Sequence, residues 1–498
     1  MSHKLDLSHL DRSGGTSITQ QLVDRFVAAI ERGELPPGEK LPPTRKLAAE
    51  AHINHLTAAR VYRRLAELGY VSATVGRGTF VRALAPAAGA DGDDWQTYAL
   101  PPRDVAYAEQ VLAEALSLSG DESVISLATG GPAPDLSPTA DLARIAADVF
   151  AEEGSAAISL LTAEGLYGLR EQIALRGRDQ GFAFDTDEVI VTSGAQQAID
   201  LTARSVLQPG DVAAVESPTY LGLLSSLRAT GARVLGIPVD AHGLDVDMLE
   251  ALLGRHEIKL VALQTASHNP TGCHLSEERR TRLAELAVER NLFVLEDRVY
   301  ADVRFEGTQV RPLRELAPGH VIHINSLSKV VGGGIRIGWL ACRGPLRERI
   351  AVLKLQSDLH TSTLAQHLAA RFLASGGYDR HLQHTIPTYR ERRDGLMAAL
   401  ERHLPGEYRA EVPRGGHHVW VTLARPIDER ALYAEGMRTG VTFVPGGAVT
   451  AERRSHTSLR LSFSLRSLDE LDEGMRRLAR AVREARRRAR RSVAAPVG

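Results

Sequence analysis

Apolar positions near the start of the chain predict three short helices. The first helix is expected to bury four residues that lie four positions apart: Ile18, Leu22, Phe26 and Ile30. Glycine and proline after residue 32 end this helix, and a second helix is expected over 45–51. A third helix is expected to turn Val61, Leu65 and Leu68 inward, because they lie at positions i, i+4 and i+7.

The outward face of the third helix is polar and basic. It consists of Asn54, His55, Thr57, Arg60, Arg63 and Arg64. Two short β-rich runs, 70–75 and 79–82, flank the turn Gly76-Arg77-Gly78 and predict a hairpin with a cationic tip. Three helices and a basic hairpin are the parts of a winged helix-turn-helix, in which the third helix enters the major groove of DNA and the hairpin contacts the backbone.

Composition shifts divide the chain into a head (13–82), a linker (83–104), a body (105–485) and a basic tail (486–498). The first part of the linker reads ALAPAAGADGDD, has no hydrophobic periodicity and is typical of a flexible connection. The body alternates strand-like and helix-like segments, which predicts a mainly parallel sheet with helices on both faces. Its expected strands are 189–192, 212–215, 234–239, 260–264, 293–295 and 321–325.

Polar motifs follow the expected strands, at the sheet edge where open α/β sheets bind ligands. A glycine turn that opens a helix offers backbone N–H groups to a phosphate, and an arginine between apolar residues suggests a buried anion contact. The six motifs are Thr192–Gln197, Ser217–Tyr220, His268–Gly272, Leu295–Tyr300, Asn325–Arg336 and Ser458–Phe463.

Overall composition excludes a wholly disordered or collagen-like chain. The small number of lysines also limits which of them can carry lysine chemistry. The 498 residues are 43% hydrophobic and 24% charged, enough for about three globular domains at ~150 residues each. No run is long enough to span a membrane and no signal peptide is visible, so a cytoplasmic location is expected. Cys273 and Cys342 form neither a disulfide framework nor a metal motif, and no metal is expected. Of six lysines, only Lys329 follows a strand and a hydroxyl-rich turn.

The formal charge of −1 is the sum of three unequal parts: the head carries +4, residues 475–498 carry +8, and the remainder carries −13. Different segments are therefore expected to have different partners. The Arg-rich stretch Arg476–Arg491 is interpreted as the continuation of a C-terminal helix, with a nucleic-acid-binding arm as the alternative.

The segments ELPPGEKLPPTRKLA, NHLTAARVYRRLAELGYV and GRGTFV resemble the DNA-binding domain of GntR-type regulators. The resemblance implies binding to double-stranded operator DNA. It also implies DNA-binding roles for Arg45, Asn54, His55, Thr57, Arg77 and Gly78. His55 stands where this family often has arginine.

The ordered motifs of the body resemble fold-type I pyridoxal-phosphate enzymes, the aspartate aminotransferase-like fold with a small C-terminal α/β part. The resemblance implies a Schiff base between Lys329 and pyridoxal 5′-phosphate, and a pairing of Asp297 with the ring nitrogen. Tyr220 would stack on the ring, and Arg460 would bind the carboxylate of an amino acid. Contacts to the 3′-oxygen and to the phosphate are implied for Asn269, Tyr300, Gly194, Ala195, Gln196, Ser326, Ser328 and Arg336. Lys329, Asp297 and Tyr300 would be the catalytic residues.

A GntR-type head joined to such a body resembles the MocR subfamily of transcription regulators. This implies a homodimer whose body senses pyridoxal phosphate or an amino acid or amine effector. The alternative is a working aminotransferase with a fused DNA-binding domain. Leu160 stands where many fold-type I relatives have a tyrosine that reaches the neighbouring subunit's phosphate, and this departure favours the regulator.

Overall fold

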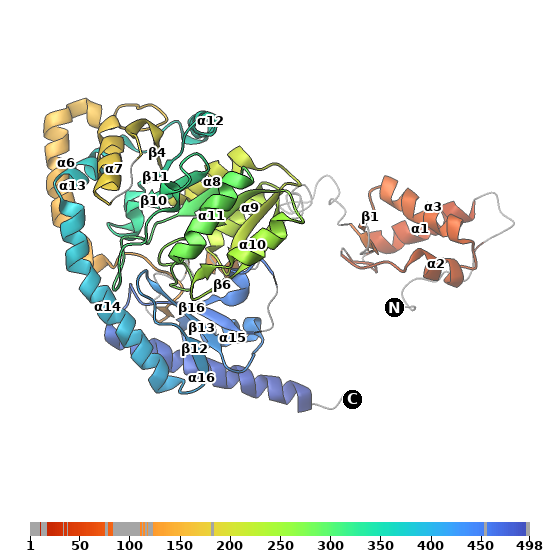
Figure 1. Ribbon diagram of the computed structural model, residues 1–498. Coiled ribbons are helices and arrows are strands. Elements are labelled where there is room, and N and C mark those ends of the chain that lie inside the picture. The colour runs from red at the N-terminus through yellow and green to blue at the C-terminus, as the bar shows by residue number, and fades with distance from the viewer. Residues whose placement is uncertain are drawn as a thin grey trace. The chain divides into compact units, whose positions relative to one another are not determined.

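The computed structural model describes residues 17–74 and 78–82 (apart from 33 and 37), 123–180, 184–452 and 456–494, with single residues at 10, 110, 111, 113, 114 and 117. The chain divides into two compact units, Met1–Asp104 and Val105–Gly498 (Figure 1). The segment expected as a linker lies outside the described residues. No helix within the described ranges is long and apolar enough to cross a membrane.

The first unit has three helices and a two-stranded antiparallel hairpin, as the sequence predicts. Its elements are α1 (Ile18–Glu31), α2 (Thr44–Glu50), α3 (His55–Glu67), β1 (Val71–Thr74) and β2 (Gly78–Val81). Leu22 and Phe26 of α1 are buried against Val61 and Leu65 of α3. The four-residue spacing of apolar positions therefore places one stripe of each helix in a shared core.

The prediction that Leu68 points inward is wrong. The helix α3 ends at Glu67, and Leu68 is its C-cap residue, with 43% of its surface exposed. A helical spacing predicts burial only while the helix continues, and Leu68 lies one residue beyond it. At the other end Asn54 is the N-cap, since its Oδ1 accepts a hydrogen bond of 2.7 Å from the Thr57 N–H.

An eight-stranded sheet forms the centre of the second unit, in the order β4-β11-β10-β9-β8-β5-β6-β7. The six strands β4, β5, β6, β8, β9 and β10 run in one direction, whereas β11 and β7 run antiparallel to their neighbours. The strands are β4 (Val189–Thr192), β5 (Val212–Ser217), β6 (Arg233–Asp240), β7 (Gly243–Leu244), β8 (Ile258–Leu263), β9 (Phe293–Asp297), β10 (Val321–Ser326) and β11 (Gly338–Ala341). The expected strands are all present.

Helices cover both faces of this sheet (Figure 1). Alternate strand residues point to opposite faces, so Ala213 and Val215 pack under α8, α9 and α12, whereas Ala214 packs against α10 and α11. The helices of this part are α6 (Thr139–Glu153), α7 (Tyr167–Asp179), α8 (Ala195–Val206), α9 (Leu221–Ala229), α10 (Val246–Leu253), α11 (Glu277–Glu289), α12 (Pro345–Asp358) and α13 (Thr363–Ala374). The short 3₁₀ helices are η2 (Pro134–Leu136), η3 (Gly154–Ile158), η4 (Thr186–Glu188), η5 (Leu313–Glu315), η6 (Leu327–Lys329), η7 (Gly333–Ile335) and η8 (Gly446–Ala448).

A smaller α/β part follows toward the C-terminus. Its antiparallel sheet has the order β12-β13-β16-β15, and a separate parallel pair joins β14 to β3. The elements are α14 (Gly377–His403), β12 (Tyr408–Ala410), β13 (His418–Leu423), α15 (Glu429–Thr439), β14 (Val441–Thr442), β15 (Val444–Pro445), β16 (Ser458–Ser462) and α16 (Leu468–Ala494), with β3 at Ile125–Ser126.

The basic stretch near the C-terminus is helical. The helix α16 continues past residue 485, where the sequence suggested that a tail begins, and ends at Ala494. Five of its arginines make ion pairs with carboxylates of the same unit: Arg476, Arg477, Arg486, Arg487 and Arg488. The helix interpretation is therefore confirmed. Arginines that are already paired to this body are less available to phosphate, which argues against a nucleic-acid arm.

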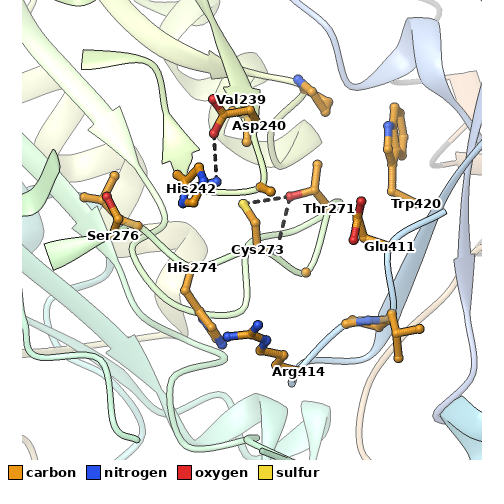
Figure 2. Close-up of a pocket in the computed structure, with 16 residues that line it drawn as sticks. Val239, Asp240, His242, Thr271, Cys273, His274, Ser276, Glu411, Arg414 and Trp420 are labelled. Carbon is orange, nitrogen blue, oxygen red and sulfur yellow. Dashed lines mark hydrogen bonds between the residues drawn. The ribbon is translucent and has the colours of Figure 1, made fainter. Parts of the chain in front are cut away.

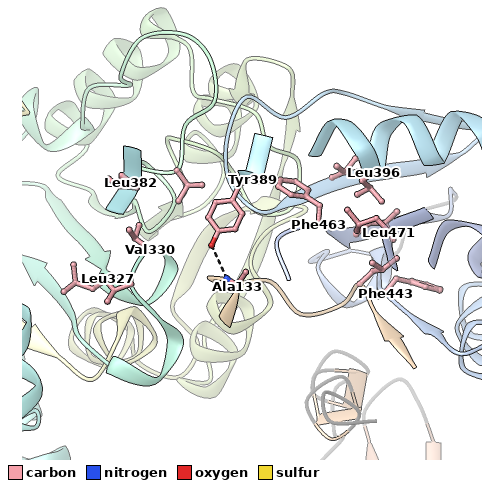
Figure 3. Close-up of a cluster of buried hydrophobic side chains, with 14 of the residues drawn as sticks. Ala133, Leu327, Val330, Leu382, Tyr389, Leu396, Phe443, Phe463 and Leu471 are labelled. Atoms are coloured by element: carbon pink, nitrogen blue, oxygen red, sulfur yellow. Dashed lines mark hydrogen bonds between the residues drawn. The ribbon is translucent and has the colours of Figure 1, made fainter. Parts of the chain in front are cut away.

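One hydrophobic core joins the small part to the large one. Figure 3 shows Leu327 and Val330 beside Leu382 and Tyr389 of α14, with Leu396, Phe443, Phe463 and Leu471 continuing the cluster. The Ala133 N–H donates to the Tyr389 hydroxyl at 3.0 Å, so the single polar group drawn at the centre of this cluster is satisfied. The core fixes the short helix η6, which carries Lys329, against α14.

Candidate cofactor site and DNA-binding head

A cavity of about 290 Å³ lies at the carboxyl ends of the parallel strands. It is the place where an open α/β sheet binds its ligand. Ten of the residues that the sequence singled out line it: Ala195, Gln196, Tyr220, Asn269, Asp297, Tyr300, Ser326, Ser328, Lys329 and Arg336. Gly194 and Arg460 lie just behind this lining: Gly194 is next to the Arg336 guanidinium, and Arg460 donates to Asn269. The fold therefore brings the six polar motifs together.

The turn before α8 is shaped for an anion. Gly194 has a φ of +83°, and a Cβ at this position would lie 2.5 Å from the Arg336 guanidinium. Only glycine allows this approach. Arg336 donates to the Ser193 carbonyl at 2.7 Å, and the buried Ser328 hydroxyl has no hydrogen-bond partner among the described residues. A guanidinium, an unpaired hydroxyl and the N-terminus of α8 together fit a phosphate group.

Gln196 has a structural role that its position in the turn did not reveal. Its Nε2 donates to the Gly222 carbonyl at 3.1 Å and to the Ser226 hydroxyl at 2.9 Å, so the side chain ties α8 to α9. A contact from Gln196 to a phosphate is therefore expected from its backbone N–H. Ser326 is also engaged, because its hydroxyl donates to the Ile337 carbonyl at 2.8 Å and accepts from the Ser328 N–H.

Lys329 faces the cavity from η6. Its Nζ lies 5.5 Å from the ring centroid of Tyr300. Removal from bulk water lowers the pKa of Lys329. A lowered pKa increases the fraction of neutral amine, the form that attacks an aldehyde.

Asp297 ends β9 and is buried beneath the cavity. Its carboxylate accepts hydrogen bonds from Gln264 Nε2 at 2.7 Å and from the Val299 N–H at 3.1 Å. Burial raises the pKa of this carboxyl group in the protein alone, and the bond from Gln264 opposes that shift. A cationic ring N–H in the cavity would favour the ionised form, because an opposite charge stabilises a buried carboxylate.

Arg460 is buried without an acidic partner among the described residues. Its guanidinium donates to Asn269 Oδ1 at 3.1 Å and to the Ala128 carbonyl, and its Nε has no partner. Burial of an uncompensated cation is costly, so this position favours an anionic ligand over a structural ion pair. Because Asn269 Oδ1 accepts from Arg460, its Nδ2 is the group able to donate to a ligand oxygen.

Two residues of the site, Gln264 and His418, could not be identified from the sequence. The Nε2 of Gln264 donates to Asp297, and its Oε1 accepts from the Asn269 N–H at 2.6 Å. His418 lies 3.1 Å from the Tyr300 hydroxyl, and a Cβ on Gly130 would overlap its ring. Burial lowers the pKa of His418 well below its ordinary value, so the imidazole is neutral. The pair His417-His418 after two glycines is a recognisable feature of the sequence, but Tyr300, which bonds to His418, lies 118 residues away.

A second lysine, Lys354, is buried close to the phosphate turn. Its Nζ pairs with Asp358 at 2.7 Å, and Asp358 also accepts from Ser193 and Gln197. The sequence placed this lysine on a charged helix, but its side chain is fully buried. Since Asp358 holds it away from the cavity, Lys329 is the one lysine among the described residues that lines the site.

Metal chemistry has no candidate centre in the described part of the chain, which contains no group of three His, Cys, Asp or Glu arranged to hold an ion. Cys273 and Cys342 are both free thiols.

The head presents its expected DNA-binding residues on α2 and α3. Arg45 on α2 is exposed, and so are Asn54 and His55 at the start of α3, whereas Thr57 is half-buried. Arg77 lies outside the described residues. Gly78 has a φ of +122°, and a Cβ there would lie 2.6 Å from Lys40 Cε, so this glycine lets β2 pass Lys40.

Comparison with known proteins places both parts of the chain. Residues 122–478 match the aminotransferase class I and II family, and residues 18–81 match the bacterial regulatory proteins of the gntR family. The multiple substrate aminotransferase of Thermococcus profundus superposes with a TM-score of 0.72 at 32% identity, over 79% of this chain and 98% of its own. The fold and the site define a fold-type I pyridoxal-phosphate protein, and the chain belongs to the aminotransferase class I and II family.

Two relatives define the arrangement more closely. The aromatic-amino-acid aminotransferase 1 of Thermococcus litoralis is 33% identical over 75% of this chain and 91% of its own length. The uncharacterized HTH-type transcriptional regulator YdfD of Bacillus subtilis is 27% identical, but over 93% of this chain and 96% of its own. A gntR-type head and an aminotransferase-like body in one chain are the architecture of the MocR subfamily.

Proposed function

We propose that this protein is a DNA-binding transcription regulator whose body binds pyridoxal phosphate and senses the cofactor or an amino compound. The observation that carries the proposal is the presence in one chain of a helix-turn-helix head with an exposed basic α3 and of a cavity lined by Lys329, Asp297 and Arg336. The head supplies contacts to DNA and the body supplies a site for a small molecule. The presence of both is expected of a ligand-controlled regulator.

Bound pyridoxal phosphate supplies an aldehyde that condenses with amines and a ring that accepts electrons. Lys329 would hold the aldehyde carbon, and Arg336 and Ser328 would bind the phosphate with the N-terminus of α8. Asp297 would keep the ring nitrogen protonated, since its buried carboxylate can accept that N–H. Tyr220 would stack on the ring, while Asn269 and Tyr300 would donate to the 3′-oxygen. Arg460 would bind the carboxylate of an incoming amino acid bidentately.

An active aminotransferase is the second candidate function, and the intact set of Lys329, Asp297 and Arg460 favours it. Lys329 and Asp297 line the cavity, and Arg460 donates to Asn269, which lines it too. Turnover assays with a panel of amino donors and keto acids separate the two functions. Sustained keto-acid formation would support the enzyme, whereas binding without turnover would support the regulator.

A homodimer is part of the proposal. Ile158, Leu160 and Leu359 are 70%, 79% and 57% exposed, and Thr363 bonds to the Ser159 carbonyl, which brings their segments together. Exposed apolar residues gathered in this way are typical of a subunit interface. A partner subunit here would cover Leu160, the position at which many relatives reach a neighbouring phosphate. A cytoplasmic location is also part of the proposal, since a regulator must reach its operator DNA there.

The double variant Leu160→Asp/Leu359→Asp is expected to convert the dimer to a monomer, because it would bury unpaired carboxylates in an apolar interface. Analytical ultracentrifugation measures the change. The control Val288→Asp alters an apolar residue of similar exposure (52%) on α11. A dimer that persists in the double variant, or a wild type that is monomeric, contradicts this interface.

Operator binding is expected to depend on the cofactor. A ligand shifts an equilibrium only through its differential affinity for the two states, and a change from 1:99 to 99:1 requires ~5.5 kcal/mol, roughly 10⁴ in affinity ratio. Covalent attachment at Lys329, with Arg336 and Arg460 engaged, is a source of part of this energy. The test is a titration of operator binding with and without pyridoxal phosphate, in wild type and in Lys329→Ala. Four identical curves would mean that head and body are uncoupled, and would favour the aminotransferase.

A further inference from the structure

A second cavity, of about 520 Å³, lies outside the cofactor site and shares no lining residue with it. Figure 2 shows this lateral cleft between two loops of the large part, which carry Asp240 and His274, and the segment Glu411–Arg414 with Trp420 of the small part. Its volume is in the range of small-molecule sites, which is ~300–1,000 Å³.

Two opposite charges in the cleft, Glu411 and Arg414, make no side-chain hydrogen bond within the described residues. Both side chains are exposed, and neither forms an ion pair within those residues. Asp240 also lines the cleft, but Arg279 already binds both of its oxygens at 2.7 Å. One carboxylate and one guanidinium are therefore available to a ligand.

Two further polar groups of the cleft, His274 and Cys273, are uncharged. Burial and the nearby Arg414 lower the pKa of His274 to about 4, and its Nδ1 accepts a bond from the Ser267 N–H at 2.9 Å. Burial raises the pKa of Cys273 to about 12, so it is a thiol, and the Thr271 hydroxyl bonds to its sulfur. The indole of Trp420, which is half-buried, offers an apolar face beside Glu411 (Figure 2).

We propose that the lateral cleft binds a zwitterionic amino compound with an apolar side chain, such as a free α-amino acid, without covalent attachment. Glu411 accepts from the ammonium group, Arg414 binds the carboxylate, and Trp420 packs against the side chain. Both charges are needed because each ligand charge leaves water on entering the cleft and must be compensated there. This binding site does not rest on the function proposed above.

The walls of the cleft are continuous with the carboxylate-binding pair of the cofactor site. Thr271 follows Asn269 by two residues, and Trp420 lies opposite Arg460 in the pairing of β13 with β16. Asn269 and Arg460 bond to each other at 3.1 Å. A ligand packed on Trp420 beside the loop of Thr271 therefore lies next to this pair and couples to ligand binding at Lys329, a coupling that rests on the proposed function.

The test is calorimetric titration of L-leucine into the full-length Lys329→Ala variant prepared without cofactor. Saturable binding is expected, with at least ~10-fold loss of affinity in the added variants Glu411→Gln and Arg414→Gln, since a hydrogen bond to a charged group is lost in each. The matched controls Glu391→Gln and Arg409→Gln change exposed, unpaired groups of the small part and should bind as the parent does. Isopentylamine and 4-methylpentanoate, which each carry one of the two charges, should bind at least ~10-fold more weakly than leucine.

Three outcomes overturn the proposal. The first is no saturable binding of leucine. The second is equal loss in the cleft variants and the controls. The third is binding abolished by Arg460→Gln but unaffected by Glu411→Gln, which would place leucine in the cofactor cavity. None of these readouts uses the cofactor or DNA, so failure of the cleft is distinguishable from failure of the regulator function.

Discussion

Replacement of Lys329 by alanine is expected to abolish the yellow absorbance of the protein reconstituted with pyridoxal phosphate. Attachment of the aldehyde needs a lysine at the cavity, and Lys329 is the only one among the described residues that lines it. The nearest other candidate, Lys354, is neutralised by Asp358 at 2.7 Å. Absorption spectra of wild type and variant, recorded after removal of free cofactor, measure the effect.

Two further variants test whether the effect is specific to Lys329. Lys259→Ala removes an exposed lysine that pairs with Asp211, and its spectrum should equal that of the wild type. Asp297→Ala keeps the lysine but removes the partner of the ring nitrogen, so the cofactor should still attach while any chemistry that draws electrons into the ring slows. A yellow band that survives in Lys329→Ala would mean that the site is assigned to the wrong lysine.

The strands and the positions of the six motifs could be predicted because both are local properties of the sequence. Ile190 and Val191 lie in a continuous apolar run that helices bury on both faces of the sheet. The small polar residues that follow this run mark the end of the strand and the turn at the sheet edge. The run Phe293–Asp297 likewise ends on the acid that lines the cavity. Local pattern therefore located both the edge of the sheet and the residues at it.

The supporting partners could not be predicted, because they join segments that are distant in sequence. Gln264 reaches Asp297 across 33 residues, and Arg460 reaches Asn269 across 191. The pairing of Lys354 with Asp358 is local, but the bonds that Asp358 accepts from Ser193 and Gln197 span 165 and 161 residues and could not be predicted. The lateral cleft could not be predicted from the sequence either, because it forms only where Glu411–Arg414 approaches the loops of the large sheet.

The affinity of the head for its operator is expected to fall steeply with salt. Arginines that neutralise phosphates release counterions, and the logarithm of affinity then falls by about 0.9 per phosphate contact for each decade of salt concentration. Arg45, which is exposed on α2 and has no carboxylate partner within the described part of the chain, is expected to be one such contact. Arg45→Ala should therefore weaken binding to all sequences and reduce the salt slope by about 1. Fluorescence anisotropy with an operator found by genome-wide binding-site mapping measures both quantities.

Changes at Thr57 and His55 should act differently, because these residues lie at the start of α3, the end of a recognition helix that faces base edges. Thr57→Ala or His55→Ala is expected to cost ~1–3 kcal/mol on the operator and little on unrelated DNA, so that sequence preference changes while the salt slope stays constant. Asn54 is unsuitable for this comparison, since its side chain caps α3 through the Thr57 N–H and its loss would also weaken the helix. An affinity that is indifferent to salt and to all three residues would contradict the winged-helix assignment, because neither the phosphate contacts nor the base contacts of α3 would then exist.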